Sequence, residues 1–264
     1  MRNTIKEFDA APFDLTKILN SVKSFSFQNS TREKVLVILG ATATGKSALA
    51  MKLAETLDTE IISADSMSVY KNFNIGTAKP SAQELQKVRH HLIDILEPTE
   101  KFSVAEFVSR AEKIITEINL RGKIPIVVGG TGLYIQALIE GYKFNDAAKS
   151  QEKILSDTGE LKYNALVIGL TANRQKLYER INERTRKMFD AGLVEEVQKL
   201  LGAGVKPNSQ AMLGIGYKET VEYLQGAATF EETVSKVSQA TRNFAKRQLT
   251  WYRRMKYINF FNVE

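Results

Sequence analysis

Residues 34–57 join an apolar run, a glycine-rich turn and a helix-forming segment, and this order restricts the chain to a small number of folds. The turn fits the pattern G-x-x-x-x-G-K-[ST] of phosphate-binding loops. Its residues are Gly40, Ala41, Thr42, Ala43, Thr44, Gly45, Lys46 and Ser47. In such a loop backbone N–H groups surround phosphate oxygens, Lys46 adds a positive charge, and Ser47 can coordinate Mg²⁺. The sequence therefore predicts a phosphate-binding loop between a strand and a helix, and it leaves the reaction open.

Apolar runs and helical patterns alternate through the rest of the chain. Strands are predicted at residues 34–39, 60–63, 124–128 and 165–170, and helices at 47–57, 104–121 and from Arg174 nearly to the end. Strands that alternate with helices are typical of a parallel sheet covered by helices. The predicted fold class is therefore α/β, a P-loop NTPase-like parallel sheet flanked by helices, with a helical and basic C-terminal region.

Domain boundaries follow from the same pattern. We assign residues 1–33 to an N-terminal extension of unknown role, 34–142 to the P-loop α/β core, 143–162 to a short polar linker, and 163–264 to the last strand and the helical C-terminal region that completes the core. The extension has neither the apolar segment nor the cleavage site of a signal peptide. No apolar run approaches the roughly 18 residues of a membrane span, so we expect no membrane partner, and the lack of a signal peptide predicts a cytoplasmic location.

The amino-acid composition excludes several kinds of site. The 264 residues include no Cys, which excludes disulfides, thiolate metal sites and catalytic thiols. The two histidines, His90 and His91, are adjacent and are too few for a usual zinc site. The net charge of +7 is concentrated in residues 174–257, which hold 16 basic and 9 acidic residues. This asymmetry favours a polyanionic partner, and a solvated helical face is the alternative.

One acidic residue stands where a parallel sheet places catalytic groups. Asp65 follows the strand at 60–63 and therefore lies beside the phosphate-binding loop. It can act as a general base or a metal ligand, or it can cap the next turn. Asp94 is a weaker candidate. The strand at 124–128 ends in Gly-Gly-Thr-Gly (129–132), without the metal-holding acid of a nucleoside triphosphatase. That turn either contacts a ligand or is only a tight turn.

The last predicted helix combines basic and aromatic side chains. Residues 242–256 hold six basic residues and no acidic one, interleaved with three aromatic residues. Arginine and lysine neutralise phosphates, and aromatic rings stack on splayed bases. We therefore expect this segment to bind RNA through Lys246, Arg247 and Trp251. Packing of the aromatic rings against the core is the alternative.

These motifs together resemble those of the tRNA dimethylallyltransferase family, also called the IPP transferase family. The resemblance covers about residues 34–142 and 163–257, with the motifs in the order of the family. The matching segments are GATATGKS (40–47), EIISADSMSVYKNFNIGTAKP (60–80), HHLIDILEP (90–98), FSVAEF (102–107), IPIVVGGTGLYIQAL (124–138), INERTRKM (181–188), GLVEEV (192–197), GIGYKE (214–219) and AKRQLTWYRR (245–254). Taken together they are far more specific than the phosphate-binding loop alone.

The resemblance implies an enzyme that transfers a dimethylallyl group from dimethylallyl diphosphate to the exocyclic amine of the adenosine adjacent to the anticodon in tRNA, with release of diphosphate. It implies that Asp65 is the general base and that the loop, with Mg²⁺ as cofactor, holds the diphosphate. It also implies that Arg184 contacts the same diphosphate and that Thr131 lines the reacting site. The positions that match tRNA-contacting segments are Asp65, Ser66, Met67, Ser68, Gly214, Gly216, Tyr217 and Lys218.

One segment departs from the family pattern. Only about 20 residues lie between Gly141 and Leu161, where the family has a helical insertion of several dozen residues that grips the anticodon stem. The acceptor is then either tRNA held by a smaller interface or free AMP, as in the related adenylate isopentenyltransferases. A degenerate copy that turns over poorly is a third explanation. A P-loop small-molecule kinase and a non-catalytic RNA-binding module are further alternatives. The leading interpretation is a monomeric prenyltransferase whose partners are tRNA and dimethylallyl diphosphate.

Overall fold

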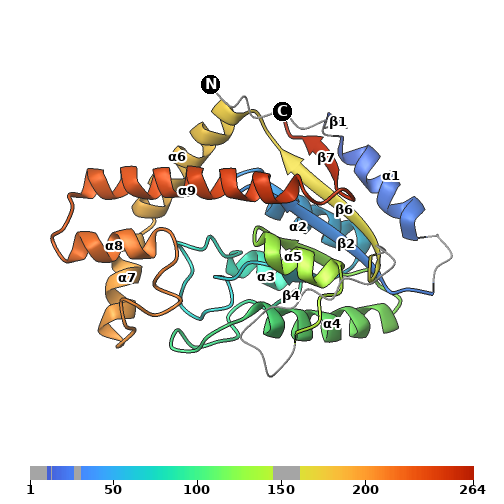
Figure 1. The fold of residues 1–264 in the computed structure, drawn as a ribbon, viewed down its shortest axis with the longest axis horizontal. Coiled ribbons are helices and arrows are strands. Elements are labelled where there is room, and N and C mark those ends of the chain that lie inside the picture. The colour runs from blue at the N-terminus through green and yellow to red at the C-terminus, as the bar shows by residue number, and fades with distance from the viewer. Residues whose placement is uncertain (1–10, 13, 27–30, 145–160) are drawn as a thin grey trace.

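A parallel sheet of seven strands runs through the part of the chain that the structure, a computed structural model, describes: residues 11–12, 14–26, 31–144 and 161–264 (Figure 1). The strands are β1 (Ala11–Pro12), β2 (Lys34–Gly40), β3 (Ile61–Ser63), β4 (His90–His91), β5 (Ile126–Gly129), β6 (Asn164–Thr171) and β7 (Asn259–Asn262). Their order across the sheet is β1-β7-β6-β2-β5-β3-β4, and each neighbouring pair is parallel. The predicted α/β class with a parallel sheet is confirmed.

Helices cover both faces of this sheet and extend beyond one end of it (Figure 1). They are α1 (Leu15–Ser26), α2 (Lys46–Leu57), α3 (Ala82–Lys87), α4 (Val104–Leu120), α5 (Gly132–Ile139), α6 (Arg174–Asp190), α7 (Leu193–Gly202), α8 (Tyr217–Leu224) and α9 (Phe230–Tyr252). The helices predicted at 47–57 and 104–121 correspond to α2 and α4. The predicted helical C-terminal region corresponds to α6 through α9.

Alternate residues of the central strand face two separate hydrophobic layers. Val37 and Leu39 of β2 belong to the layer under α4, α5 and α9, whereas Leu36 and Ile38 belong to the layer under α1 and α2. This alternation follows from the twofold repeat of a strand, whose successive side chains point to opposite faces. A parallel sheet covered on both sides buries each of these residues, which explains the continuous apolar run in the sequence.

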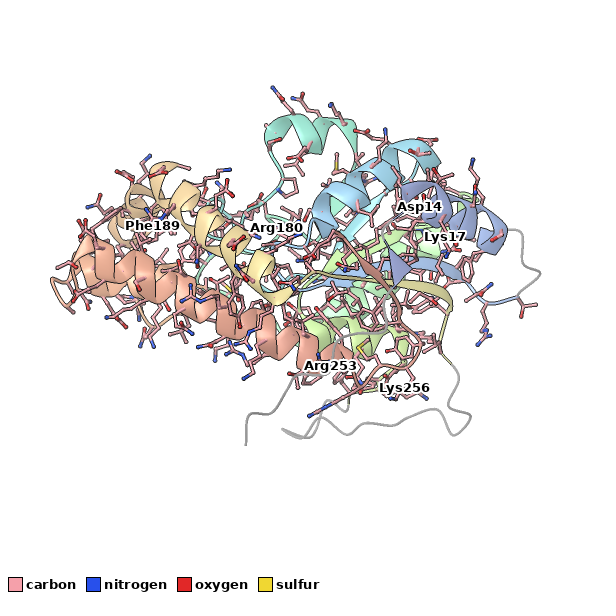
Figure 2. The ribbon with its side chains drawn as sticks, turned by 90° about the horizontal axis from the view of Figure 1, so that it is seen from above. Asp14, Lys17, Arg180, Phe189, Arg253 and Lys256 are labelled. Atoms are coloured by element: carbon pink, nitrogen blue, oxygen red, sulfur yellow. The ribbon has the colours of Figure 1, made fainter. Side chains whose placement is uncertain are left out.

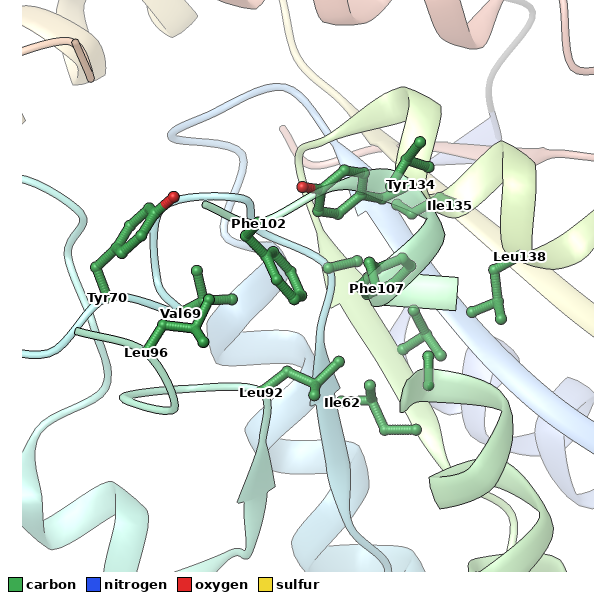
Figure 3. Close-up of a cluster of buried hydrophobic side chains, with 14 of the residues drawn as sticks. Ile62, Val69, Tyr70, Leu92, Leu96, Phe102, Phe107, Tyr134, Ile135 and Leu138 are labelled. Carbon is green, nitrogen blue, oxygen red and sulfur yellow. The ribbon is translucent and has the colours of Figure 1, made fainter. Parts of the chain in front are cut away.

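Aromatic side chains fix the segment that follows β3 (Figure 3). Tyr70 is fully buried in this cluster. Phe107 of α4 stacks on Tyr134 of α5 with ring centroids 4.6 Å apart, and Phe102 meets the same ring edge-on at 6.0 Å. Such rings bury large areas and pack in defined orientations. The cluster therefore holds residues 64–70, the beginning of the segment after β3, against the sheet.

Part of the predicted N-terminal extension belongs to the folded core. Asp14 caps α1, where its Oδ1 accepts hydrogen bonds from the backbone N–H groups of Thr16 and Lys17 (Figure 2 labels Asp14 and Lys17). Within α1, Ile18 and Val22 are buried in the layer that also contains α2. β1 pairs with β7 at the edge of the sheet. The segment 1–33 is thus not separate from the core over residues 11–12 and 14–26.

The C-terminal end also differs from the prediction. The chain leaves α9 and adds β7 to the sheet beside β6, with Phe261 opposite Leu170. Sequence patterns predicted helix nearly to the end and did not identify this strand. Residues 145–160 of the predicted linker lie outside the described residues. Within the described residues, no helix is both long enough and apolar enough to cross a membrane.

Candidate active site

The phosphate-binding loop connects β2 to α2 through unusual backbone conformations. Gly45, immediately before α2, has φ 85°, a left-handed value that glycine adopts without strain because it lacks Cβ. A hydrogen bond within the loop stabilises it: the hydroxyl of Thr44 donates to the carbonyl oxygen of Ala41 over 2.8 Å. The loop ends at the N-terminus of α2, where unpaired backbone N–H groups favour an anion. The predicted loop therefore has the geometry of an anion site.

Two cations lie at this loop, Lys46 within it and Arg184 beside it. Arg184 of α6 donates from Nη1 to the hydroxyl oxygen of Thr42 over 3.0 Å. Burial and the nearby Arg184 guanidinium lower the pKa of Lys46 to about 8, while Asp65 acts in the opposite direction. Burial also lowers the pKa of Arg184, again opposed by Asp65. Two positive groups that are partly withdrawn from water are stabilised by a bound polyanion.

A buried glutamine of α9 ties the phosphate-binding loop to the turn that follows β5. Gln248 accepts at Oε1 from the backbone N–H of Thr42 over 2.9 Å, and its Nε2 donates to the carbonyl oxygen of Gly130 over 2.8 Å. The hydroxyl of Tyr252 donates to the same carbonyl over 2.9 Å. Sequence reasoning missed Gln248. A usable signal was present, because this polar residue shares a helical face with Ala245 and Tyr252, both buried.

Asp65 is half-buried at the carboxyl end of β3, in a turn that is hydrogen-bonded to the turn after β5. Its Oδ1 accepts from the backbone N–H of Met67 over 2.8 Å. The backbone N–H of Ser66 donates to Oγ1 of Thr131 over 3.1 Å, and the N–H of Thr131 donates to the carbonyl oxygen of Ala64 over 3.3 Å. These bonds join the turns after β3 and β5 and fix the orientation of the Asp65 carboxylate.

One cavity of about 310 Å³ is lined by some of these groups, and Thr42 is the residue of the phosphate-binding loop that lines it. Its polar lining includes Thr42, Asp65, Thr131 and Arg184. Much of the remaining wall is apolar and comes from α6, α9 and the segment before α8: Ile181, Met188, Leu213, Ile215, Val237 and Phe244. A concave, largely apolar cavity with a few convergent polar groups is typical of a small-ligand site. This one can hold an anionic group at the loop and uncharged groups along the apolar wall.

The residues predicted to contact RNA divide into two groups. Those that line the cavity are Asp65, Ser66, Met67, Gly214, Tyr217 and Arg247. Those that do not line it are Ser68, Gly216, Lys218, Lys246 and Trp251. Ser68 is buried. The indole of Trp251 lies directly over Gly132, and its ring N–H is buried. For Trp251 the structure therefore favours the alternative of packing against the core over stacking on a base.

The excess positive charge is carried by helices that also line the cavity. α6 and α9 pack side by side (Figure 1). Figure 2 shows Arg180 on α6, and Arg253 and Lys256 in the segment that follows α9. Within the cavity wall, the Arg247 guanidinium lies 5.7 Å from the ring centroid of Phe244. A polyanion that follows the basic groups of α9 therefore reaches the cavity.

The site fits a Mg²⁺ ion only in company with a phosphorylated ligand. No group of three or more His, Asp or Glu side chains gathers at a possible metal site among the described residues. Ser47 is exposed at the start of α2, next to Lys46. Mg²⁺ prefers oxygen ligands and commonly takes several of them from substrate phosphates and water. The Ser47 hydroxyl can supply one ligand, and the rest would come from phosphate oxygens and water.

Comparison with known proteins relates most of the chain to one family. The sequence model described as IPP transferase matches residues 68–158 and 145–255. The tRNA dimethylallyltransferase of Carboxydothermus hydrogenoformans is 44% identical over 87% of this chain and 92% of that protein. The corresponding protein of Streptococcus equi subsp. equi is 42% identical over 88% and 93% of the two chains.

Solved structures give the same relation. The tRNA isopentenylpyrophosphate transferase of Bacillus halodurans superposes with a TM-score of 0.80 at 37% identity, covering 88% of this chain and 90% of that one. A eukaryotic dimethylallyltransferase whose structures concern its action on tRNA superposes with a TM-score of 0.75 at 26% identity, covering 87% and 74%.

The same comparisons indicate that this chain lacks positions that its relatives have. The match to the Carboxydothermus protein runs over 287 positions, whereas 87% of the 264 residues is about 230, so about 57 positions have no counterpart here. The two matches to the family model overlap at residues 145–158. That overlap falls within the linker at 143–162, where the sequence shows the departure from the family pattern.

Proposed function

The chain belongs to the IPP transferase family, as its motifs indicated, and on this premise we propose that it transfers a dimethylallyl group from dimethylallyl diphosphate to the exocyclic amine of the adenosine adjacent to the anticodon in tRNA. The observation that carries the proposal is the cavity in which Thr42 of the phosphate-binding loop, Arg184 and Asp65 meet. It combines an anion site, a carboxylate base and an apolar wall. These are the parts that a prenyl transfer from a diphosphate requires.

The reaction replaces one bond at the first carbon of the dimethylallyl group. The bond from this carbon to the diphosphate oxygen breaks, and its electron pair leaves with the diphosphate. The adenosine nitrogen supplies the pair for the new C–N bond and loses a proton to the Asp65 carboxylate. Lys46 and Arg184 stabilise the negative charge that builds up on the leaving group. Because diphosphate only departs, no nucleoside triphosphate is hydrolysed, and β5 runs into Gly130 and Thr131 rather than an acid.

The other residues position the two substrates. The Ser47 hydroxyl and the diphosphate oxygens would hold a Mg²⁺ ion, which would supply further charge neutralisation at the leaving group. Thr42 orients Arg184 through the hydrogen bond between their side chains. The target base leaves its stack in the tRNA loop before it can react. The apolar wall that includes Leu213 and Phe244 excludes water from the allylic carbon.

Free AMP is the alternative acceptor. The observation that favours it is the absence here of about 57 positions that the match to the Carboxydothermus relative contains. A shorter chain offers less surface for an anticodon stem. The basic residues along α6 and α9 favour tRNA, because a mononucleotide needs only a few cations. We further propose that the protein acts as a monomer, since one chain supplies the whole cavity, and in the cytoplasm, where it meets tRNA.

Acceptor choice tests this function directly. Purified protein is incubated with Mg²⁺ and dimethylallyl diphosphate, with unmodified tRNA or AMP offered in parallel, and the adenosine product is measured by mass spectrometry. We expect prenylated adenosine in tRNA and none from AMP. Product from AMP alone would assign the protein to the free-nucleotide branch. An absence of product from both acceptors would contradict the proposal and favour a degenerate copy or an RNA-binding module.

A further inference from the structure

Three consecutive backbone N–H groups converge on one carboxylate next to the cavity. Glu196 of α7 accepts from Asn74 over 3.1 Å, from Ile75 over 2.9 Å and from Gly76 over 3.4 Å. Successive N–H groups that point to one place form an anion-binding concavity. In this chain a side chain of the protein itself occupies that concavity. Since hydrogen bonds to an ionised group are among the stronger ones, Glu196 ties the 73–77 segment firmly to α7.

Tyr217, the first residue of α8, completes the arrangement. Its hydroxyl donates to Oε1 of Glu196 over 2.7 Å, and the side chain is buried. Its ring lies so close to Gly76 that a Cβ there would come within 2.5 Å of it. The same ring packs on Phe73 with centroids 4.6 Å apart. Glu196 therefore holds both the segment and the aromatic ring that supports it.

The conformation of the segment makes an external anchor necessary. Asn72 and Ala78, which flank it, have φ 67° and φ 50°, values that residues with a Cβ rarely adopt. A second contact comes from Lys79, which donates to Oδ1 of Asn74 over 3.3 Å and pairs with Asp94. Backbone in left-handed conformations persists where surrounding contacts hold it. Glu196 supplies three of those contacts from a separate helix.

The anchored segment is one wall of the cavity. Gly76 and Thr77 line it together with Gly214 and Tyr217. This wall carries no positive charge, whereas Thr42 and Arg184 form the end that suits the diphosphate. We propose that Glu196 is a positioning residue that fixes the 73–77 segment as the wall against which the acceptor adenosine lies. The identity of that acceptor rests on the proposed function.

Steady-state kinetics of two neighbouring variants test this role. Glu196→Gln keeps one acceptor oxygen but turns an amide N–H₂ toward the backbone donors. Glu195→Gln makes the same change of charge at the adjacent, exposed position and serves as the control. In Glu196→Gln we expect the KM for a tRNA transcript to rise by about tenfold or more while the KM for dimethylallyl diphosphate changes by less than about twofold. Glu195→Gln should leave both values unchanged.

Several outcomes overturn the inference. It is wrong if Glu196→Gln behaves as Glu195→Gln does, or if both KM values rise together as they would for a general loss of structure. Should Glu196→Gln fold poorly, Tyr217→Phe removes one donor and keeps the ring, and an unchanged KM for tRNA in that variant is equally contrary. Should the wild type fail to prenylate tRNA, the proposed function fails, and hydrogen exchange at the amides of 74–76 still tests the anchor. Faster exchange in Glu196→Gln is expected, and unchanged exchange contradicts it.

Discussion

Lys46 and Arg184 place two positive charges beside the phosphate-binding loop, and both side chains are partly withdrawn from water. Burial and the Arg184 guanidinium lower the pKa of Lys46 to about 8, and Asp65 offsets part of this effect. A bound diphosphate acts in the opposite direction, because a nearby anion favours the charged form of lysine. The free protein is therefore the state in which Lys46 loses its proton most readily.

The value of kcat/KM for dimethylallyl diphosphate should depend on whether Lys46 is protonated. Above about pH 8 the free protein loses the Lys46 charge that attracts the anion, so kcat/KM for dimethylallyl diphosphate should fall as the pH rises. The Lys46→Arg variant retains its positive charge to much higher pH, so its fall in kcat/KM should occur at higher pH. Initial rates measured across the alkaline range check this. A wild-type profile that coincides with that of Lys46→Arg would contradict it.

At the scale of elements, residues of α9 line the cavity and also form hydrogen bonds to the phosphate-binding loop and to the turn after β5. Thr241 and Phe244 line the cavity, Gln248 binds Thr42, and four residues further on Tyr252 binds Gly130. The sequence predicted this helix and its basic charge from composition and spacing. The spacing of Ala245, Gln248 and Tyr252 marks the buried face, but the sequence could not identify the partners of Gln248, because these are elements that α9 meets only in the fold. The loop and Asp65 were predictable, since a motif and a strand end fix their places locally.

Gln248→Leu should weaken diphosphate binding. The change leaves the buried N–H of Thr42 without its partner, and an unsatisfied buried group costs about 1–3 kcal/mol. We expect a lower melting temperature and a smaller thermal shift on addition of inorganic diphosphate with Mg²⁺. Gln239→Leu, at an exposed position of the same helix, is the matched control. An affinity for diphosphate equal to that of Gln239→Leu would show that Gln248 does not support the loop.

For the molecule as a whole, the central strands were predicted and the edges of the sheet were not. β2, β5 and β6 appear as apolar runs because they are buried on both faces. β1 and β4 span two residues each, too few for a periodic signal, and β7 (Asn259–Asn262) begins and ends with a polar residue and so does not form an apolar run. Their places depend on neighbours distant in sequence, as Ala11 opposite Phe261 illustrates. The role of α1 as part of the core was missed for the same reason.

The contribution of α1 can be measured as stability. Ile18 is fully buried against the sheet, so Ile18→Ala should lower the free energy of unfolding by about 2–5 kcal/mol. Lys17→Ala, at the exposed neighbouring position, should change it by less than about 0.5 kcal/mol. Urea unfolding of the two variants and the wild type gives the comparison. Equal stability of both variants would mean that α1 is dispensable to the core.

The most direct test of the whole account is the rate of prenyl transfer to tRNA by Asp65→Asn. The asparagine keeps the oxygen that accepts from the Met67 N–H but cannot take the proton of the adenosine amine. In single turnover, with product measured by mass spectrometry, we expect the rate to fall by about 10²–10⁴-fold while tRNA binding stays at the wild-type level. A transfer rate equal to that of the wild type would contradict the assignment of Asp65 as the base and with it the proposed mechanism.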